Sequence, residues 1–265
     1  MREVLEKLAR GEVSLQEAET ALRLLAVEDV GNLARLDVGR EIRHGAPEVV
    51  IAEGKLPGDV ARIVRQALTQ LQRVIISRVS EDHLEALKAL AIEGEDKLFE
   101  VRGRTVVIRR EGSSGRATGG RVGVIAAGTS DIPVAEEAEV MASEMGCEVV
   151  AAYDVGAAGV HRVLAPLKEM ITRDVDAIVV VAGREGALPT LLAGMVDVPI
   201  IAVPTSTGYG LGEKGIGALM AMLQSCSLGL AVVNIDAGIP AGAVAASIAN
   251  RAAKFRRTSQ SSPEG

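Results

Sequence analysis

The side chains best suited to chemistry in this sequence lie in short polar segments of its second half. They carry hydroxyl, carboxylate, imidazole and guanidinium groups, which bind anions and transfer protons. Each segment comes shortly after an apolar run that is typical of a buried strand. Both tyrosines, Tyr153 and Tyr209, lie in or beside these segments, which are 128–131, 154–156 with 159–162 just beyond, 183–186, 205–210 with Glu213, and 236–238.

The first of these segments, Gly128-Thr-Ser-Asp131, lies between an apolar run and a helical pattern. Ser130 or Asp131 is able to cap that helix, and Pro133 suits its first turn. Backbone N–H groups and the helix dipole converge on an anion at such a junction. The motif therefore indicates an anion site or a plain capped helix, and it does not decide between them.

Two pairs of neighbouring residues also admit both a functional and a structural interpretation. Glu185 is able to act as a general acid or base, or it forms a surface ion pair with Arg184. His161 beside Arg162 suits a phosphate or carboxylate, or the two residues simply begin a helix in solvent. Since no His, Cys or Asp cluster has the spacing of metal ligands, the sequence predicts no structural zinc site.

The elements that must position these side chains alternate between strand and helix from Arg121 onward. Such alternation predicts a parallel sheet with helices on both faces. Ligands bind outside the carboxyl ends of the strands in these sheets, and every polar segment above leaves one of those ends, so we expect a ligand cleft there. The expected strands are 121–127, 148–153, 175–181, 198–203 and 230–235, and the expected helices are 131–145, 160–172, 187–196, 214–225 and 240–254.

Residues 1–110 predict a small α+β domain, in which Ser14-Leu-Gln-Glu17 is a capping box that opens the second helix. His44 and His83 fall in polar surroundings and are expected at the surface. The expected helices are 2–10, 14–25, 58–72 and 80–91, with strands at 47–52 and 74–79 and a hairpin over 98–109.

The segment 111–120 is rich in glycine and small polar residues, and it predicts a linker. It separates the first domain from a second domain at 121–255. The last residues, 256–265, are expected to form a disordered tail.

Composition argues against several classes of protein. With a net charge of −6 and only 2% aromatic residues, the 265-residue chain is unsuited to binding a phosphate backbone, so we expect no nucleic-acid partner. Its two cysteines lie far apart and predict no disulfide framework, and no signal peptide is recognised. The most apolar segment, 215–235, is interrupted by polar residues and fits a buried helix followed by a strand. We therefore expect a soluble, cytoplasmic protein with no membrane partner.

Several motifs occur in one order along the chain: Leu36-Asp37, Pro47-Glu-Val-Val50, Glu53-Gly-Lys55, Gly128-Thr-Ser-Asp131, Val160-His-Arg162, Gly183-Arg-Glu-Gly-Ala-Leu-Pro189, Val203-Pro-Thr-Ser-Thr-Gly-Tyr-Gly210, Met222-Leu-Gln-Ser-Cys226 and Val233-Asn-Ile-Asp236. Together they resemble the LarB family, the pyridinium-3,5-biscarboxylic acid mononucleotide synthases that begin assembly of a nickel-pincer cofactor. The catalytic domain of that family is similar to the aminoimidazole ribonucleotide carboxylases (PurE). The resemblance implies an α/β fold, a flavodoxin-like three-layer parallel sheet preceded by a small α+β domain. The chain departs from the family at Ala237, where members often carry Asn, and at Lys214, where a small residue is commoner.

The resemblance implies a two-part reaction on nicotinic acid adenine dinucleotide. One part carboxylates C5 of the pyridinium with CO2 or bicarbonate, and the other hydrolyses the phosphoanhydride with Mg2+ and releases AMP. A thiolate that adds at C4 would make the cationic ring a neutral dihydropyridine whose C5 is nucleophilic. By resemblance, Cys226 is this nucleophile and Glu185 is the base that removes the C5 proton. The expected substrate-binding residues are Gly128, Ser130, Asp131, His161, Arg162, Arg184, Ser206, Tyr209 and Asp236.

Cys226 poses a difficulty, because it ends an expected helix at the sheet edge opposite the cleft, and a helix C-terminus disfavours a thiolate. A neighbouring subunit of a homo-oligomer resolves it, since the related carboxylases form octamers with shared sites. The cationic ring would then favour the thiolate. Without the resemblance, Cys226 would be interpreted as an inert core residue, which is what we expect of Cys147.

Two other functions stay open at this point. An aminoimidazole ribonucleotide carboxylase or mutase is the enzymatic alternative, although those enzymes lack an N-terminal domain of this kind and do not depend on a thiol. The non-enzymatic alternative is a nucleotide-sensing module that binds a dinucleotide without turnover.

Overall fold

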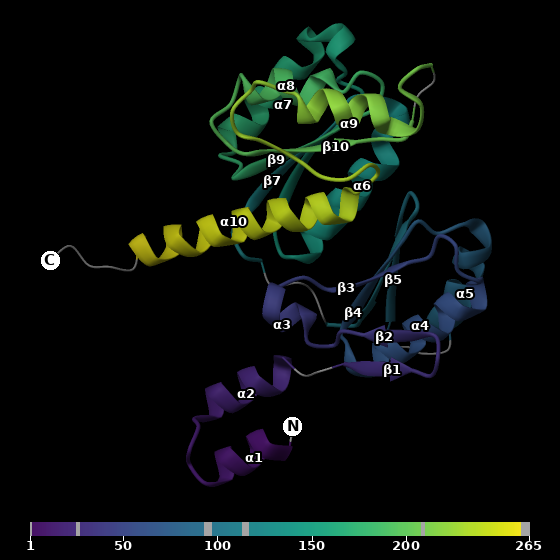
Figure 1. Cartoon of the computed structure of the whole chain (residues 1–265), viewed down its shortest axis with the longest axis vertical. Helices are drawn as coiled ribbons and strands as arrows, with labels where there is room; N and C mark the ends of the chain where they lie inside the picture. The colour runs from purple at the N-terminus through teal and green to yellow at the C-terminus, as the bar shows by residue number, and fades with distance from the viewer. Residues whose placement is uncertain (1, 25–26, 93–96, 113–116, 208–209, 261–265) are drawn as a thin grey trace, which may run out of the picture. The chain divides into compact units, whose positions relative to one another are not determined.

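The computed structural model describes residues 2–24, 27–92, 97–112, 117–207 and 210–260. The chain divides into two compact units, 1–114 and 115–265 (Figure 1). None of the helices within the described ranges is both long and apolar enough to cross a membrane.

The first unit is built on a four-stranded sheet with a helical layer. Its elements are α1 (Arg2–Ala9), α2 (Leu15–Leu24), β1 (Glu28–Val30), β2 (Ala34–Leu36), α3 (Arg40–His44), β3 (Glu48–Ile51), α4 (Pro57–Gln70), β4 (Arg73–Ser77), α5 (Glu81–Ile92), β5 (Lys97–Arg102) and β6 (Thr105–Arg110). The sheet order is β3-β4-β6-β5, in which β3 and β4 are parallel and the other pairs are antiparallel.

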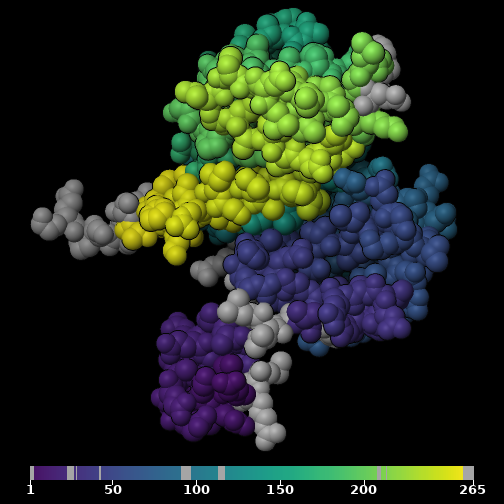
Figure 2. Space-filling view, viewed as in Figure 1, coloured from purple at the N-terminus to yellow at the C-terminus, as the bar shows by residue number. Residues whose placement is uncertain are grey.

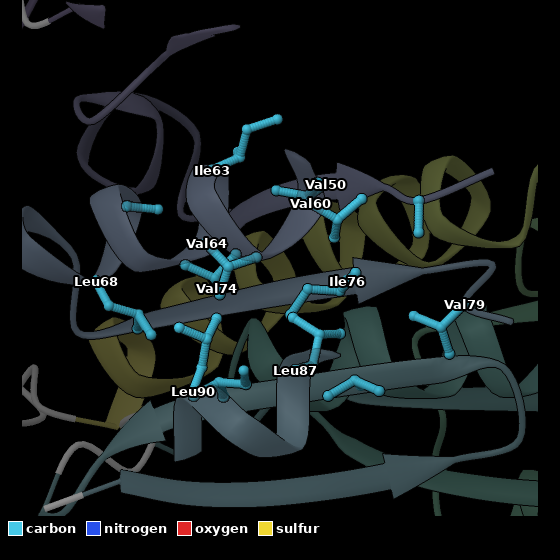
Figure 3. Packing of buried hydrophobic residues seen from close by; sticks show 14 of the residues in the cluster. Val50, Val60, Ile63, Val64, Leu68, Val74, Ile76, Val79, Leu87 and Leu90 are labelled. Carbon is cyan, nitrogen blue, oxygen red and sulfur yellow. The ribbon is translucent and has the colours of Figure 1, made fainter. Parts of the chain in front are cut away.

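The core of this unit forms between one face of the sheet and helices α4 and α5 (Figure 3). The apolar residues of α4 recur at helical spacing and make one buried stripe. Alternate residues of β4 meet that stripe, because successive strand side chains point to opposite faces. The buried residues that Figure 3 labels are Val50, Val60, Ile63, Val64, Leu68, Val74, Ile76, Val79, Leu87 and Leu90.

The expected capping box is present, because the Glu17 carboxylate accepts from the Ser14 N–H at 2.7 Å and the Ser14 hydroxyl accepts from the Glu17 N–H at 3.2 Å. His44 is exposed as expected, whereas the expectation for His83 was wrong. His83 is buried, with Nδ1 accepting from the Ser80 N–H at 3.2 Å and Nε2 lying 3.0 Å from the Lys55 carbonyl oxygen. Both ring nitrogens have backbone partners, which makes burial of the imidazole acceptable.

The second unit is a five-stranded parallel sheet between two layers of helices (Figure 1). Its elements are β7 (Arg121–Ala126), α6 (Ile132–Glu144), β8 (Glu148–Ala152), α7 (His161–Thr172), β9 (Ala177–Ala182), α8 (Ala187–Ala193), β10 (Ile200–Pro204), α9 (Ile216–Leu223), β11 (Leu230–Val232) and α10 (Gly238–Gln260). The strand order is β11-β10-β9-β7-β8, which is the flavodoxin-like order, so the expected fold is confirmed.

Two helix layers cover the two faces of this sheet. Helices α7, α8 and α9 pack on one face through a cluster that includes Val163, Leu192 and Met222. Helices α6 and α10 pack on the other face and lie very close together. A Cβ atom at Gly242 of α10 would lie 2.4 Å from the Ala138 carbonyl oxygen of α6, so only glycine permits this approach.

Helix α10 corrects the expected tail. Figure 2 shows it in yellow at the surface of the second unit, and its described residues extend to Gln260, so residues 256–260 are helical rather than disordered. Arg256 provides the physical reason, because its guanidinium bonds to the buried Asp176 carboxylate and to the Gly119 carbonyl oxygen at 3.0 Å. The Asp176 carboxylate raises the pKa of Arg256, and a long-range pair of this kind has no local sequence signature.

Candidate functional site

A cleft of about 380 Å³ opens outside the carboxyl ends of β7 and β9. The strand order reverses at this pair, since β8 lies on one side of β7 and the later strands lie beyond β9. Ligands of open parallel sheets bind at such switch points. The expected cleft is therefore present at the expected edge, and its lining residues are Ala127, Gly128, Asp131, Gly156, Ala157, Ala158, Arg162, Ala182, Gly183, Arg184, Glu185, Ala187 and Leu188.

Asp131 joins the loop after β7 to the loop after β10. It is buried, and its Oδ2 accepts from the Gly128 N–H at 2.9 Å. Its Oδ1 accepts from the hydroxyls of Thr205 at 2.6 Å and Thr207 at 2.9 Å. Asp131 occupies the position before α6, but its side chain makes no capping bond to that helix. The sequence expected Ser130 or Asp131 as a possible cap of this helix, and it did not predict the contacts of Asp131 with Thr205 and Thr207.

Gly183 allows the loop after β9 to lie against the same threonines. A Cβ atom at this position would lie 2.6 Å from Thr205 Oγ1 and from the Thr207 carbonyl oxygen. Backbone cannot move away as easily as the end of a flexible side chain, so a larger residue would separate the two loops. Glycine at 183 thus permits the close contact between the loop after β9 and the loop after β10.

Several charged residues around this edge have left-handed backbone conformations. Asp154, Arg184 and Asp236 have φ values of 57°, 50° and 55°, and they follow β8, β9 and β11 respectively. Non-glycine residues adopt this conformation at an energetic cost and are enriched at functional sites. The same conformation also occurs at Asp174, which precedes β9 at the opposite edge of the sheet, so these φ values describe tight turns at the strand ends and do not by themselves mark a site.

The charges of the cleft favour an anionic ligand beside a group that transfers protons. Arg162 and Arg184 contribute two guanidinium groups to the lining, and Glu185 contributes a carboxylate. Arg162 also pairs with the exposed Asp154 at 3.4 Å, which holds the guanidinium at the rim. Guanidinium groups bind phosphate and carboxylate in a bidentate manner, and an exposed carboxylate is able to accept a proton.

The remaining expected residues lie in several places. Ser206 and Asp236 come together, because the Ser206 N–H donates to Asp236 Oδ1 at 2.8 Å. Ser130 and His161 are exposed and do not line the cleft within the described chain. Tyr209 lies outside the described residues.

The two cysteines have opposite environments. Cys226 is exposed on the connection that leads from α9 to β11, and it does not line the cleft within one described chain. Cys147 is buried, with Sγ 3.2 Å from Asn250 Oδ1, and burial raises the pKa of its thiol to about 11. An exposed thiol is the one available to a substrate, whereas the Cys147 environment disfavours a thiolate.

Thr205 and Thr207 are the contacts that the sequence did not single out. They lie in a polar loop that was expected at the cleft, but hydroxyl groups in such a loop have no pattern that separates positioning from solvation. Within the described ranges, no group of three or more His, Cys, Asp or Glu side chains is able to hold a metal ion.

A second cavity, of about 550 Å³, lies in the first unit between the β1–β2 turn and α4. Its lining includes the exposed Leu33 and Arg62, and Arg62 pairs with Asp59. Since no carboxylate, imidazole or thiol lines it, this cavity lacks the groups for acid–base or nucleophilic chemistry.

Comparison with known proteins follows the division into two units. Residues 27–110 match the LarB/PurE-like N-terminal domain, and residues 121–261 match the AIR carboxylase family. The chain is 41% identical over 254 residues to an uncharacterized protein of Methanocaldococcus jannaschii, in an alignment that covers 94% of this chain and 96% of that protein.

Two relatives of the second unit have names that state an activity. An N5-carboxyaminoimidazole ribonucleotide mutase of Thermotoga maritima is 29% identical over 133 residues, which cover 48% of this chain and 74% of the mutase. The mutase of the same name from M. jannaschii is 29% identical over 127 residues, which cover 47% of this chain and 76% of the mutase. These matches support a carboxylase-type, PurE-like enzyme. Because an AIR carboxylase domain with its cleft at the switch point follows a LarB/PurE-like N-terminal domain, the chain belongs to the LarB family.

Proposed function

We propose that this protein carboxylates C5 of the pyridinium ring of nicotinic acid adenine dinucleotide, using CO2 or bicarbonate, and hydrolyses the phosphoanhydride to release AMP. The product would be pyridinium-3,5-biscarboxylic acid mononucleotide, which enters nickel-pincer cofactor synthesis. The observation that carries the proposal is a cleft that combines Arg162, Arg184 and Glu185 in a chain of this family.

The two arginines suit the negative groups of this dinucleotide. The substrate carries a diphosphate and a ring carboxylate, and each is a bidentate partner for a guanidinium group. The hydrogen bond from the Gly128 N–H to the Asp131 carboxylate would hold the loop after β7, which also lines the cleft, in place. Ser130, His161, Ser206, Tyr209 and Asp236 stay substrate-binding candidates at the rim.

Cys226 would supply electrons to the cationic ring. Its thiolate forms a bond to C4, and the ring becomes a neutral dihydropyridine whose C5 attacks CO2. Glu185 then takes the proton from C5, the electrons of that bond restore the aromatic ring, and the C4–S bond breaks to release the thiolate. The cycle replaces one hydrogen by one carboxylate, releases one proton and needs no oxidant.

A second copy of the chain would bring Cys226 to the cleft. The support is an exposed apolar surface beside this residue, on helix α9, which lies at the surface of the second unit in Figure 2. Ile216, Met220 and Leu223 are 55%, 52% and 60% exposed and recur at helical spacing along α9, and Leu228 is 89% exposed. Exposed apolar surface of this kind is typical of protein interfaces. We propose a homo-oligomer, an octamer or another even assembly, with sites at subunit interfaces.

Hydrolysis of the phosphoanhydride would add water across a P–O bond and release AMP. Mg2+ would neutralise the charge of the diphosphate in this step. The described residues offer no cluster of three metal ligands, so the ion would be held mainly by the substrate phosphates, as is common for Mg2+.

The direct test incubates the purified protein with nicotinic acid adenine dinucleotide, bicarbonate and Mg2+. The proposal expects release of AMP and a ring product heavier by one carboxyl group. Absence of both products, from a protein that is folded and oligomeric, would refute the assignment.

A complementation experiment tests the shared site. Cys226→Ala and Glu185→Gln should each abolish carboxylation, whereas assemblies reconstituted from a mixture of the two should regain part of the activity. Recovery is expected because some cleft–cysteine pairs then combine an intact Glu185 from one copy with an intact Cys226 from another. No recovery in verified mixed assemblies would place both residues of one site in the same copy.

The second candidate is an aminoimidazole ribonucleotide carboxylase or mutase, which the similarity of the second unit to the two mutases favours. This candidate would be supported if the protein turned over aminoimidazole ribonucleotide or its N5-carboxylated form, and if the Cys226→Ala variant kept that activity. A nucleotide-sensing module predicts binding of the dinucleotide without product formation, unchanged by Cys226→Ala and Glu185→Gln.

A further inference from the structure

The connection that carries Cys226 is fastened to α8 by the residues on either side of the cysteine. The Thr190 hydroxyl of α8 donates to Ser225 Oγ at 3.0 Å, and the same oxygen accepts from the Ser227 N–H at 3.2 Å. The Ser227 hydroxyl donates to the Thr190 carbonyl oxygen at 2.9 Å. Both neighbours of the exposed cysteine thus bond to a single residue of another helix.

Thr190 lies close to the cleft along its own helix. Ala187, the first residue of α8, lines the cleft, and three residues of α-helix rise about 4.5 Å. The same helix follows directly after Glu185 and Gly186. A Cβ atom at Gly186 would lie 2.8 Å from the Ala218 carbonyl oxygen of α9, so the starts of α8 and α9 are also packed together. The bonds of Thr190 therefore fasten the cysteine segment to the packed pair α8 and α9, which would hold the thiol in place when one copy presents it to the cleft of another.

The Thr190 hydroxyl differs from those of other helical threonines in this chain. Threonine in a helix commonly donates to the carbonyl oxygen four residues earlier. Thr20, Thr172 and Thr258 do so, with bonds of 2.8, 2.8 and 3.0 Å. Thr190 donates instead to a residue 35 positions away, so its hydroxyl is used to hold a second segment rather than its own helix.

We propose that Thr190 is a positioning residue that sets the place of the Cys226 thiol through Ser225 and Ser227. The proposal rests on the proposed function only in taking Cys226 as the nucleophile. A nucleophile must be held within a narrow range of distance and angle, and a displacement of about 1 Å lowers the rate by up to about a hundredfold.

The test compares Thr190→Val, Thr190→Ser and the control Thr172→Val in the full-length protein. Valine keeps the shape of threonine and removes the donor, whereas serine keeps the donor. Two quantities are measured: amide hydrogen exchange of a peptide that covers 224–228, and the kcat and KM of carboxylation of nicotinic acid adenine dinucleotide.

Thr190→Val should speed exchange of that peptide by about two- to tenfold, the factor that corresponds to one lost hydrogen bond. It should also lower kcat by about ten- to a hundredfold with KM unchanged, and serine should restore both quantities. Thr172→Val should leave both at wild-type values, because its hydroxyl bonds only to α7.

The outcomes separate this proposal from the proposed function. If the wild-type protein makes no carboxylated product, the proposed function is refuted. Faster exchange in Thr190→Val would still show that Thr190 holds the segment 224–228 in place. Wild-type exchange and kcat in Thr190→Val would overturn the positioning role. A loss of kcat that serine does not restore, or one matched by a rise in KM, would also overturn it.

Discussion

The Thr205 hydroxyl donates a 2.6 Å hydrogen bond to Asp131 Oδ1, between residues 74 positions apart in the sequence. Thr205 is completely buried and Asp131 is 5% exposed. This bond joins the loops that leave β7 and β10, and the cleft lies beside it at the end of β9. The shape of the cleft therefore depends on a polar contact that is shielded from water, where an unmade hydrogen bond is costly.

Thr205→Val should lower the free energy of unfolding of the second unit by about 1–3 kcal/mol, because a buried Asp131 oxygen loses a donor while the side-chain volume is kept. Denaturant unfolding measures the change. Thr172→Val, on the exposed face of α7, is the control and should change stability by less than about 0.5 kcal/mol. Equal effects of the two variants would show that the Thr205 bond has no special role.

Gly183→Ala should destabilise the second unit by about 1–3 kcal/mol and weaken ligand binding, because the added methyl group meets Thr205 Oγ1 and the Thr207 backbone at 2.6 Å. Gly194→Ala is the matched control. Gly194 has φ of −81°, and its Cβ would lie 3.5 Å from the nearest atom, so alanine fits there. Thermal unfolding and ligand titration of both variants test the expectation, and an unaffected Gly183→Ala protein would contradict it.

The two thiols should react at very different rates. Burial raises the pKa of Cys147 to about 11, so at pH 8 this side chain is almost entirely protonated as well as inaccessible. Iodoacetamide at pH 8 should modify Cys226 alone in the folded protein and both residues after denaturation, as followed by mass spectrometry. Rapid modification of Cys147 in the native Cys226→Ala variant would be the contrary result.

Glu48 should make the first unit less stable as pH rises. It is 8% exposed at the start of β3, and burial raises its pKa despite Arg40 at 3.3 Å. The folded state therefore binds the proton more tightly than the unfolded state, and this contribution is lost as pH rises through the folded pKa. In denaturant unfolding, Glu48→Gln should gain stability relative to the wild type as the pH rises above the ordinary pKa of a glutamate side chain. A difference that stays constant with pH, or that reverses, would be inconsistent with this burial effect.

The regular elements of the second unit were predictable because each one has its own apolar pattern. The run from Arg121 to Ala126 is a strand almost as predicted, and the later strands and helices lie near their expected positions, although β11 ends at Val232 and α10 continues to Gln260. The placement of polar loops at one edge also follows from alternation alone, since parallel strands carry their ends together. The flavodoxin-like strand order came from the family resemblance, because periodicity does not reveal which strands are neighbours.

Short elements and long-range polar contacts were not predictable. The three-residue strands β1 and β2 and the five-residue helix α3 are too short for a periodic signal, and the sequence did not predict them. His83 looks polar and exposed in sequence, but its partners are backbone groups that only the fold brings near. The Asp131–Thr205 bond is also a long-range contact, so the local motif indicated only a helix cap or an anion site and did not reveal this partner.

The central claim is that the sulfur of Cys226 adds to the pyridinium ring, and the carboxylation rate of Cys226→Ala tests it most directly. The claim predicts that this variant retains binding of nicotinic acid adenine dinucleotide and loses carboxylation by about a thousandfold or more, the scale of loss when an essential nucleophile is removed. Cys147→Ala should keep nearly wild-type activity. Carboxylation by Cys226→Ala at a rate near that of the wild type would contradict the claim.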